Sequence, residues 1–489
     1  IIIMTLAVAD SVHILTTYLH RLAEGAQRRA AMIESLRINM QPVILTSATT
    51  AIGFLTMNFS DAPPFRDLGN ICAAGVIAAF VLSVTLLPAL TVMLPMRAVR
   101  GDIASSRMFE RLGDLVVRRR GALLAGTGAF MALAIAAIPL NEINDQFVKY
   151  FGASVPFRIA SDFAGEHLVG VDRIEYSLES GDSGGINEPG FIERVEAFSN
   201  WYRRQEGVRH VSTYTDILKR LNRNLHGDDP AYERLPGNRE LAAQYLLLYE
   251  MSLPYGLDLN NQIDIDKSST RVIVSIKNLT VNEILSLEER AGRWLALHAP
   301  ELQTAGTGPS IMFAHITSRN IQAMLTGTVL ALLLISLLLI AAFRSVGLGL
   351  ASVIPNLAPV GMAFGIWAVV HGEVGLSLSV VAAMTLGIVV DDTVHFLSKY
   401  LRARRERSLD PADSIRYAFI SVGPALLTTS VVLIAGFSLL AFSAFKINAG
   451  MGLMTAMTIA IALVVDFLFL PPLLMLFEEK RHARADRTC

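Results

Sequence analysis

The stretch Asp10-Ser-Val-His-Ile-Leu-Thr-Thr-Tyr-Leu19 recurs near the other end of the chain as Asp392-Thr-Val-His-Phe-Leu-Ser-Lys-Tyr-Leu401. The two copies share six residues of ten at an offset of 382. Further matches at 382 or 383 make the apolar segments within 1–95 recur as 376–477. Parallel repeats of membrane helices are typical of transporters, and the functional site lies at the interface between the repeats. These further matches are Pro42/Pro424, Thr46/Thr428, Gly53/Gly436, Gly69/Gly452 and Pro88/Pro471.

The composition excludes an ordinary soluble protein. Of the 489 residues, 52% are hydrophobic and 17% are charged, and the mean hydropathy is +0.46. Soluble domains carry about 25% charged residues, so we expect neither an enzyme nor catalytic residues. The net charge of −1 gives no indication of a nucleic-acid partner. The two cysteines, Cys72 and Cys489, lie outside the central polar region, which therefore has no disulfide framework.

Nine segments are long and apolar enough to cross a membrane, since a spanning helix takes about 20 residues. Arg and Lys are concentrated in 20–39, 97–120, 399–416 and the tail 478–489, while the opposite links are nearly free of them. By the positive-inside rule these basic segments and the C-terminus are cytoplasmic, and the region 141–320 lies outside. We expect the spans at 1–19, 40–58, 68–95, 121–140, 321–343, 347–370, 376–398, 418–442 and 449–477.

The region 141–320 is predicted to be one mixed α/β domain. Alternating apolar residues predict strands over 173–178 and 271–276. Amphipathic patterns predict helices over 191–205 and 239–251. On the other side of the membrane, Met108 to Arg120 is basic and amphipathic, which predicts a helix along the inner membrane surface.

Ionisable groups within predicted spans are few, and they cluster in the repeat. Each costs about 2.5–3.5 kcal/mol at mid-membrane, so such a group is a functional candidate by default. Residues three apart share a helix face, so the repeat should set the face of Asp10 and His13 against that of Asp392 and His395. Carboxylates that share a low-dielectric site cannot all be ionised, so some should hold protons, as a proton relay requires. The predicted relay is Asp10, Asp391, Asp392, His13 and His395, with supporting hydrogen bonds from Ser11, Thr393, Thr428 and Thr429.

Two other interpretations of these groups remain open. The groups could pair with one another simply to lock the bundle. A paired carboxylate-x-x-His motif also occurs in di-iron bundles, but those need carboxylates from two more helices, and the spans 40–58, 68–95 and 418–442 have none. We therefore expect no metal and no cofactor, with the proton gradient as energy source. Asp466 is predicted to be a helix-end residue, because its repeat partner is Ser83.

These residues resemble the resistance–nodulation–division (RND) superfamily, and within it the exporters that share the mycobacterial membrane protein large (MMPL) domain. The likeness rests on Ala9-Asp10-Ser-Val-His-Ile, on Gly387-Ile-Val-Val-Asp391-Asp392-Thr-Val-His, on Asn144-Asp-Gln-Phe-Val-Lys-Tyr-Phe151 and on Leu470-Pro-Pro-Leu-Leu. It implies a polytopic helical bundle with one α/β periplasmic domain, of porter type, at 141–320. Such proteins have twelve membrane helices, so this chain would start at helix four. Residues 1–96 would then be helices four to six, 121–140 helix seven and 321–477 helices eight to twelve, with a cytoplasmic linker at 97–120 and a cytoplasmic tail at 478–489.

The resemblance carries the family's proton-relay acids over to Asp10, Asp391 and Asp392. The drug-efflux branch has an acid pair on helix four and a lysine on helix ten, whereas the predicted helix ten, 376–398, has an acid pair and no lysine. This pattern is more similar to the lipid-handling exporters, including hopanoid transporters and the Patched-like group. The resemblance implies proton-driven export of hydrophobic or lipid-like substrates in the bacterial inner membrane.

The expected partners are membrane lipids, a hydrophobic or lipid-like substrate, a periplasmic protein and further copies of the chain. Two alternatives remain. The protein could be a non-pumping accessory or sensor, similar to the Sec-associated or Patched-like relatives. The chain could also be an inactive piece of a longer protein.

Overall fold

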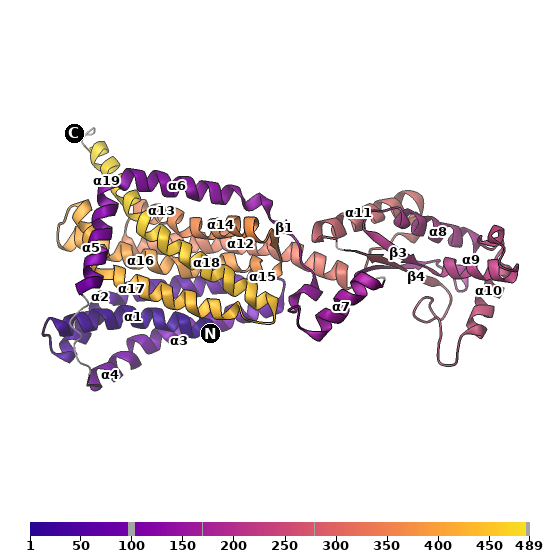
Figure 1. Cartoon of the computed structure of the whole chain (residues 1–489), viewed down its shortest axis with the longest axis horizontal. Helices are drawn as coiled ribbons and strands as arrows, with labels where there is room; N and C mark the ends of the chain where they lie inside the picture. The colour runs from indigo at the N-terminus through magenta and orange to yellow at the C-terminus, as the bar shows by residue number, and fades with distance from the viewer. Residues whose placement is uncertain (96–102, 169, 278, 486–489) are drawn as a thin grey trace. The chain divides into compact units, whose positions relative to one another are not determined.

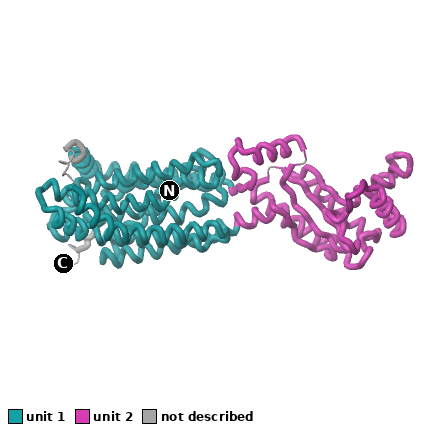
Figure 2. The backbone as a smooth tube through the Cα atoms, turned by 90° about the horizontal axis from the view of Figure 1, so that it is seen from below, with its two compact units in different colours: residues 1–142, 319–489 teal, residues 143–318 magenta. Residues whose placement is uncertain are grey.

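The computed structural model describes residues 1–95, 103–168, 170–277 and 279–485, and it divides the chain into two compact units. Unit 1 comprises residues 1–142 and 319–489, and unit 2 comprises residues 143–318 (Figure 2). The second unit occupies the stretch in which the sequence predicts an outer domain. The first part of the predicted linker, 97–102, and the end of the predicted tail, 486–489, lie outside the described residues.

Unit 1 is a bundle of long apolar helices (Figure 1). Over the described residues, nine helical segments are long and apolar enough to cross a membrane, as predicted. Its helices are α1 (Ile2–Ala23), α2 (Arg28–Leu55), α3 (Pro63–Val84), α4 (Leu86–Met93), α5 (Ile103–Arg118), α6 (Arg120–Ala136), the larger part of α12 (Pro309–Phe343), α13 (Val346–Ala351), α14 (Val353–Val370), α15 (Leu376–Ser379), α16 (Val381–Glu406), α17 (Pro411–Leu440), α18 (Lys446–Leu468) and α19 (Leu470–Ala485). The short strands β1 (Glu142–Ile143) and β5 (Glu373–Val374) form a two-stranded sheet.

The last helix of each repeat breaks at an equivalent position. The break between α3 and α4 falls at Thr85, three residues before Pro88, and the break between α18 and α19 falls at Phe469, two residues before Pro471. Proline lacks the N–H that would continue the helical hydrogen-bond ladder, so a break in the turn before it is expected. The two prolines are repeat partners, so the repeat extends from sequence to backbone geometry.

The helix α16 is the most enclosed of the nine candidate spans of the described chain, with 94% of its most apolar window buried. Where α16 crosses α2, each helix has a glycine at the point of contact, Gly387 in α16 and Gly53 in α2. A Cβ on Gly53 would lie 2.9 Å from the Cα of Gly387, and a Cβ on Gly387 would lie 3.0 Å from the carbonyl oxygen of Thr49. Small residues let membrane helices approach closely, and here they bring one helix of each repeat into backbone contact.

The predicted amphipathic stretch 108–120 is helical as far as Arg118, as part of α5. Its apolar side chains Phe109 and Val116 are buried, and Phe109 packs within the same core cluster as Phe419 of α17. On its polar side, Asp114 accepts a hydrogen bond from Arg416 at 2.7 Å. The amphipathic pattern therefore serves in part to pack α5 against the end of the bundle.

Unit 2 is built on a three-stranded antiparallel sheet in the order β2-β4-β3, formed by β2 (Arg173–Glu179), β4 (Ser269–Ile276) and β3 (Val208–Ser212). Alternate residues of β2, namely Ile174, Tyr176 and Leu178, are buried in one core with side chains of α8 and α11. In that core the hydroxyls of Tyr176 and Tyr202 are 2.6 Å apart. The helices of the unit are α7 (Pro156–His167), α8 (Pro189–Arg203), α9 (Tyr214–Leu225), α10 (Arg239–Ser252), α11 (Val281–His298) and the start of α12.

The secondary structure of unit 2 matches the sequence prediction in part. Strands β2 and β4 lie at the predicted 173–178 and 271–276, and helices α8 and α10 lie at the predicted 191–205 and 239–251. The prediction named neither β3 nor the helices α7, α9 and α11. Short 3-10 helices complete the chain at Thr56–Phe59, Ile138–Leu140, Phe147–Tyr150, Gly185–Asn187, Pro230–Tyr232 and Pro300–Leu302.

Candidate functional site

The structure brings the two repeat-related helix faces together at their histidines. His13 projects from α1 and His395 from α16, and their rings are stacked with centroids 3.5 Å apart and planes 7° apart. His13 is 3% exposed and His395 is fully buried. The i, i+3 spacing places each histidine on the same face as the carboxylate before it. The stacked pair therefore lies at the interface between the repeats, where the sequence predicts the site.

Each repeat holds its aspartate with a serine from the next helix. Ser47 of α2 donates a hydrogen bond to Asp10 at 3.1 Å, and Ser430 of α17 donates one to Asp392 at 2.8 Å. All four residues are buried. Ser47 and Ser430 are 383 residues apart and the two aspartates are 382 apart, so these are the same contact in the two repeats. In both repeats the aspartate is therefore tied to a neighbouring helix by one hydroxyl.

A second contact is also repeated, but a serine in the first repeat stands where the second repeat has an acid. Ser11 of α1 lies 3.4 Å from the hydroxyl of Ser83 in α3, and Thr393 of α16 donates to Asp466 of α18 at 2.7 Å. Asp466 is fully buried. Asp466 lies in the last turn of α18, as the prediction of a helix-end residue requires, but its carboxyl contacts a residue of the predicted site. Its repeat partner Ser83 occupies the equivalent hydrogen-bonding position.

The third predicted acid, Asp391, lies beside a cavity that residues of both repeats line. Its Oδ1 is 3.5 Å from Nε2 of His395, and it lines a small cavity together with Asp10 and Thr46. The cavity measures about 20 Å³, which is room for about one water molecule. The arrangement gathers carboxyls, hydroxyls and imidazoles of both repeats in one part of the bundle.

The structure places two of the predicted supporting hydroxyls elsewhere. Thr428 is exposed and donates to the carbonyl of Pro424, and Thr429 donates to carbonyls of its own helix. The hydroxyl that reaches a carboxylate belongs to the next residue, Ser430, because each step along a helix turns the side chain by about 100°. The prediction that Thr428 and Thr429 bond to the acids is therefore corrected to Ser430 and, in the other repeat, Ser47.

Lys399 is a further correction. The prediction that Lys399 lies in a cytoplasmic loop, which leaves helix ten without a lysine, is wrong, because α16 continues to Glu406 and Lys399 is only 7% exposed. Its Nζ lies 3.4 Å from Oδ1 of Asn39 in α2. The basic residues after it made this stretch look like a loop, although a helix commonly extends beyond the apolar segment. Lys399 follows His395 by one turn, on the same face.

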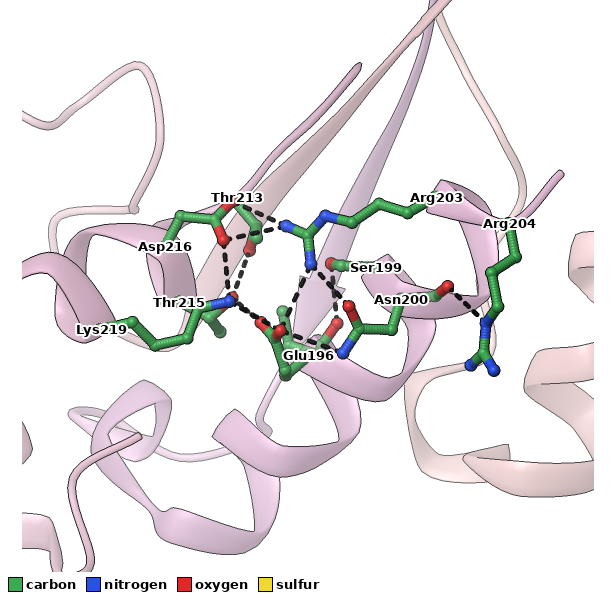
Figure 3. Close-up of polar contacts among 10 residues, drawn as sticks. Glu196, Ser199, Asn200, Arg203, Arg204, Thr213, Thr215, Asp216 and Lys219 are labelled. Carbon is green, nitrogen blue, oxygen red and sulfur yellow. Dashed lines mark hydrogen bonds and ion pairs between the residues drawn. The ribbon is translucent and has the colours of Figure 1, made fainter. Parts of the chain in front are cut away.

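Within the described part of the chain, no group of three or more His, Cys, Asp or Glu side chains is placed to hold a metal ion. The densest charged network of unit 2 lies between α8 and α9 (Figure 3). There Glu196 contacts Lys219 at 2.7 Å, and Arg203 contacts Asp216 at 2.8 Å. Burial opposes ionisation of Glu196, but hydrogen bonds from Lys219 and Thr215 outweigh it and lower the pKa of that carboxyl. With two acids matched by two bases, the network is suited to joining the two helices.

Fold and site together define a polytopic helical membrane protein with buried acids at repeat-related positions. The structure resembles the hedgehog release protein Disp from the water bear Hypsibius dujardini, with a TM-score of 0.66 at 14% identity, over 97% of this chain and 63% of that one. It also resembles SecDF in its super-membrane-facing form, with a TM-score of 0.54 at 13% identity, over 100% of this chain and 55% of that one. At these identities the likeness concerns the fold.

The chain belongs to the MMPL family, whose sequence profile matches residues 1–123 and 266–488. It is 27% identical over 144 residues to a Mycobacterium tuberculosis protein named "Probable transport protein MmpL1", which is 28% of this chain and 14% of that protein. The chain spans a quarter or less of the length of the curated relatives that it matches. The two parts of the family match include the candidate relay helices α1 and α16.

Proposed function

We propose that the protein is a proton-driven secondary transporter of RND/MMPL type that moves hydrophobic or lipid-like substrates out of the bacterial inner membrane, with its C-terminal tail in the cytoplasm. The observation that carries the proposal is the repeated contact of Asp10 with Ser47 and of Asp392 with Ser430, with the stacked histidines at the interface between the repeats. Burying several carboxylates in a membrane bundle is costly, and a purely structural role would not favour placing them twice at equivalent positions.

The contacts supply a way to couple protonation to movement. Each serine hydroxyl joins two helices by donating to a carboxylate, α2 to α1 in one repeat and α17 to α16 in the other. When the carboxylate gains a proton its charge is lost, the hydrogen bond weakens, and the balance between two helix arrangements shifts. One proton that crosses 100 mV supplies about 2.3 kcal/mol, and each pH unit adds about 1.4 kcal/mol. These energies are sufficient to bias a two-state bundle.

Two features of unit 2 support an apolar substrate. Its cavity of about 540 Å³ is bordered by α11 and residues 303–306 and is lined mainly by apolar atoms, with His315 2.8 Å from Glu288 at its edge. That volume is in the usual range for a ligand site. In addition, Met251, Tyr255 and Ile265 are strongly exposed near the end of α10 and in the loop after it. Side chains exposed in this way are available to contact an apolar partner.

The test is a transport assay in vesicles that contain the protein and a fluorescent lipid analogue. A proton gradient should drive movement of the analogue between leaflets, and a protonophore should stop it. Binding of the analogue without gradient-dependent movement would contradict the pump and support the sensor or accessory function. Asp10→Asn and Asp392→Asn should each abolish the movement while leaving the folded protein intact.

The substrate part of the proposal has its own control. Gly292 lines the unit 2 cavity, and a Cβ added there would meet nothing within 4 Å. Gly292→Trp should therefore fill the cavity without a clash and lower the apparent affinity for the lipid analogue. Gly237→Trp is the matched variant, because Gly237 is equally unobstructed but lies outside the cavity. Equal behaviour of the two variants would remove this cavity from the substrate path.

A further inference from the structure

A second cavity lies at the end of the bundle where α2 begins and α12 and α16 end. It measures about 210 Å³, enough for several water molecules or a small polar group. All of its walls belong to unit 1. The charged and hydroxyl-bearing residues of its lining are Arg37, Ser398, Lys399, Arg402, Arg405 and Glu406.

The cavity is lined by four bases and one acid. Arg402 contacts Glu406 at 2.7 Å, and Arg37 contacts Glu34, just outside the cavity, at 2.9 Å. Arg405 donates instead to the carbonyl oxygen of Phe343 at 2.8 Å, and within the described chain it has no carboxylate partner. The lining therefore carries an excess of positive charge, and part of it is not neutralised by the protein.

The buried wall of the cavity contains polar atoms that lack strong partners. Lys399 is more than nine-tenths buried, and among the described residues its ammonium meets only the neutral Asn39, at 3.4 Å. The hydroxyl oxygen of the adjacent Ser398 is buried and has no hydrogen-bond partner in the described structure. A buried charge without a counter-charge is costly, so an anion in this cavity would be strongly favoured.

We propose that this cavity binds a phosphate group, delivered either by an anionic lipid headgroup or by soluble phosphate. Guanidinium groups suit the fixed geometry of phosphate oxygens, and Lys399 and Ser398 supply a point charge and a hydroxyl at the inner wall. The cavity lies between helices at the end of the bundle rich in Arg and Lys, and basic pockets of this kind bind phospholipid headgroups. A bound phosphate would join α2, α12 and α16 at one place.

The test measures lipid binding by native mass spectrometry of the purified protein with phosphatidylglycerol and with phosphatidylcholine. Phosphatidylglycerol should be retained selectively. The double variant Arg402→Gln and Arg405→Gln should bind it about 25-fold more weakly, because each base near an anionic lipid contributes roughly fivefold. The matched control is Arg28→Gln with Arg29→Gln, which removes two exposed bases of α2 that do not line the cavity. An equal loss in both double variants would mean diffuse attraction to bases and would overturn the site.

One further variant and one titration also test the site. Glu406→Gln removes the acid of the cavity and its pairing with Arg402, so it should tighten phosphate binding, and unchanged or weaker binding contradicts the site even if the arginine variants fail to fold. Inorganic phosphate, titrated against bound phosphatidylglycerol, identifies the source. Displacement at low millimolar concentration indicates a soluble phosphate, and resistance to displacement indicates the lipid headgroup. Binding of neither probe overturns the proposal.

Discussion

Replacing Gly387 by alanine should weaken the crossing of α2 and α16, and with it the cluster one turn further along α16. A Cβ at Gly387 would lie 3.0 Å from the carbonyl oxygen of Thr49 and 3.1 Å from the Cα of Thr50, whereas ordinary contacts are at 3.4–4 Å. Both neighbours are backbone atoms, so the helices themselves must separate. The same movement would lengthen the 3.0 Å hydrogen bond from Thr50 to the carbonyl of Gly387.

The expected size of the effect follows from overpacking. An extra methyl group forced into a close-packed contact costs about 1–3 kcal/mol. Alanine also favours the helix over glycine by about 1 kcal/mol, so the comparison needs a variant that gains this preference without the clash. Gly126→Ala in α6 is that variant, because a Cβ there would meet nothing within 4 Å.

The assay is the thermal unfolding midpoint of both purified variants in the same detergent. Gly387→Ala should be less stable than Gly126→Ala by about 1–3 kcal/mol, and it should also lose transport activity in vesicles. A Gly387→Ala protein that is as stable as Gly126→Ala and transports normally would refute the inferred backbone contact between the repeats.

Three other variants test separate parts of the account. His395→Phe keeps a ring for stacking on His13 but has no ring nitrogens, so it should fold, as judged by size-exclusion chromatography, and abolish proton-coupled transport. Asp466→Asn retains an acceptor for Thr393 and should lower the transport rate by roughly tenfold, equivalent to about 1.4 kcal/mol; an unchanged rate would remove Asp466 from the site. Glu196→Gln should destabilise the protein by about 2 kcal/mol at neutral pH. Because the pKa of Glu196 is lowered in the folded state, the difference from the wild type in chemical denaturation should disappear as the pH falls below the ordinary value of 4.5.

The spans, the repeat and two of the three unit 2 strands could be predicted because each leaves a strong periodic signal. The strands β2 and β4 alternate apolar and polar residues, whereas β3 reads Val208-Arg-His-Val-Ser212 and has little alternation. Helix α9 was not predicted, although Leu218, Leu221 and Leu225 recur at helical spacing, because the charged and polar residues between them make the segment hydrophilic on average. Several helices extend beyond the predicted spans, because hydropathy indicates where the membrane ends and not where the helix ends. For this reason Lys399, one residue beyond its predicted span, was assigned to a loop.

Asp10, Asp392 and the two histidines could be named in advance, since they are the ionisable groups of the repeated motif, and Asp391 directly precedes one copy. Their hydroxyl partners could not be named correctly, because this needs the register to within one residue. Identity between the repeats pairs Thr46 with Thr428 at an offset of 382, whereas the contacts of Ser47 and Ser430 follow an offset of 383. The offset changes from 382 to 383 because the second repeat has one inserted residue. If that residue is placed before Thr46, the offset of 383 pairs Ser47 with Ser430 and identifies both serines. The contact of Asp466 with Thr393 depends on how α18 packs on α16, which no local pattern reports.

The most direct test of the central claim is proton movement itself. Vesicles that contain the protein and a pH-sensitive dye should show a proton flux that starts when the lipid analogue is added. Asp392→Asn should abolish this flux. Asp67→Asn, which removes an exposed carboxylate from α3, should leave it unchanged. A substrate-dependent proton flux that persists in the Asp392→Asn protein at the wild-type rate would contradict the assignment of the buried cluster as the proton relay.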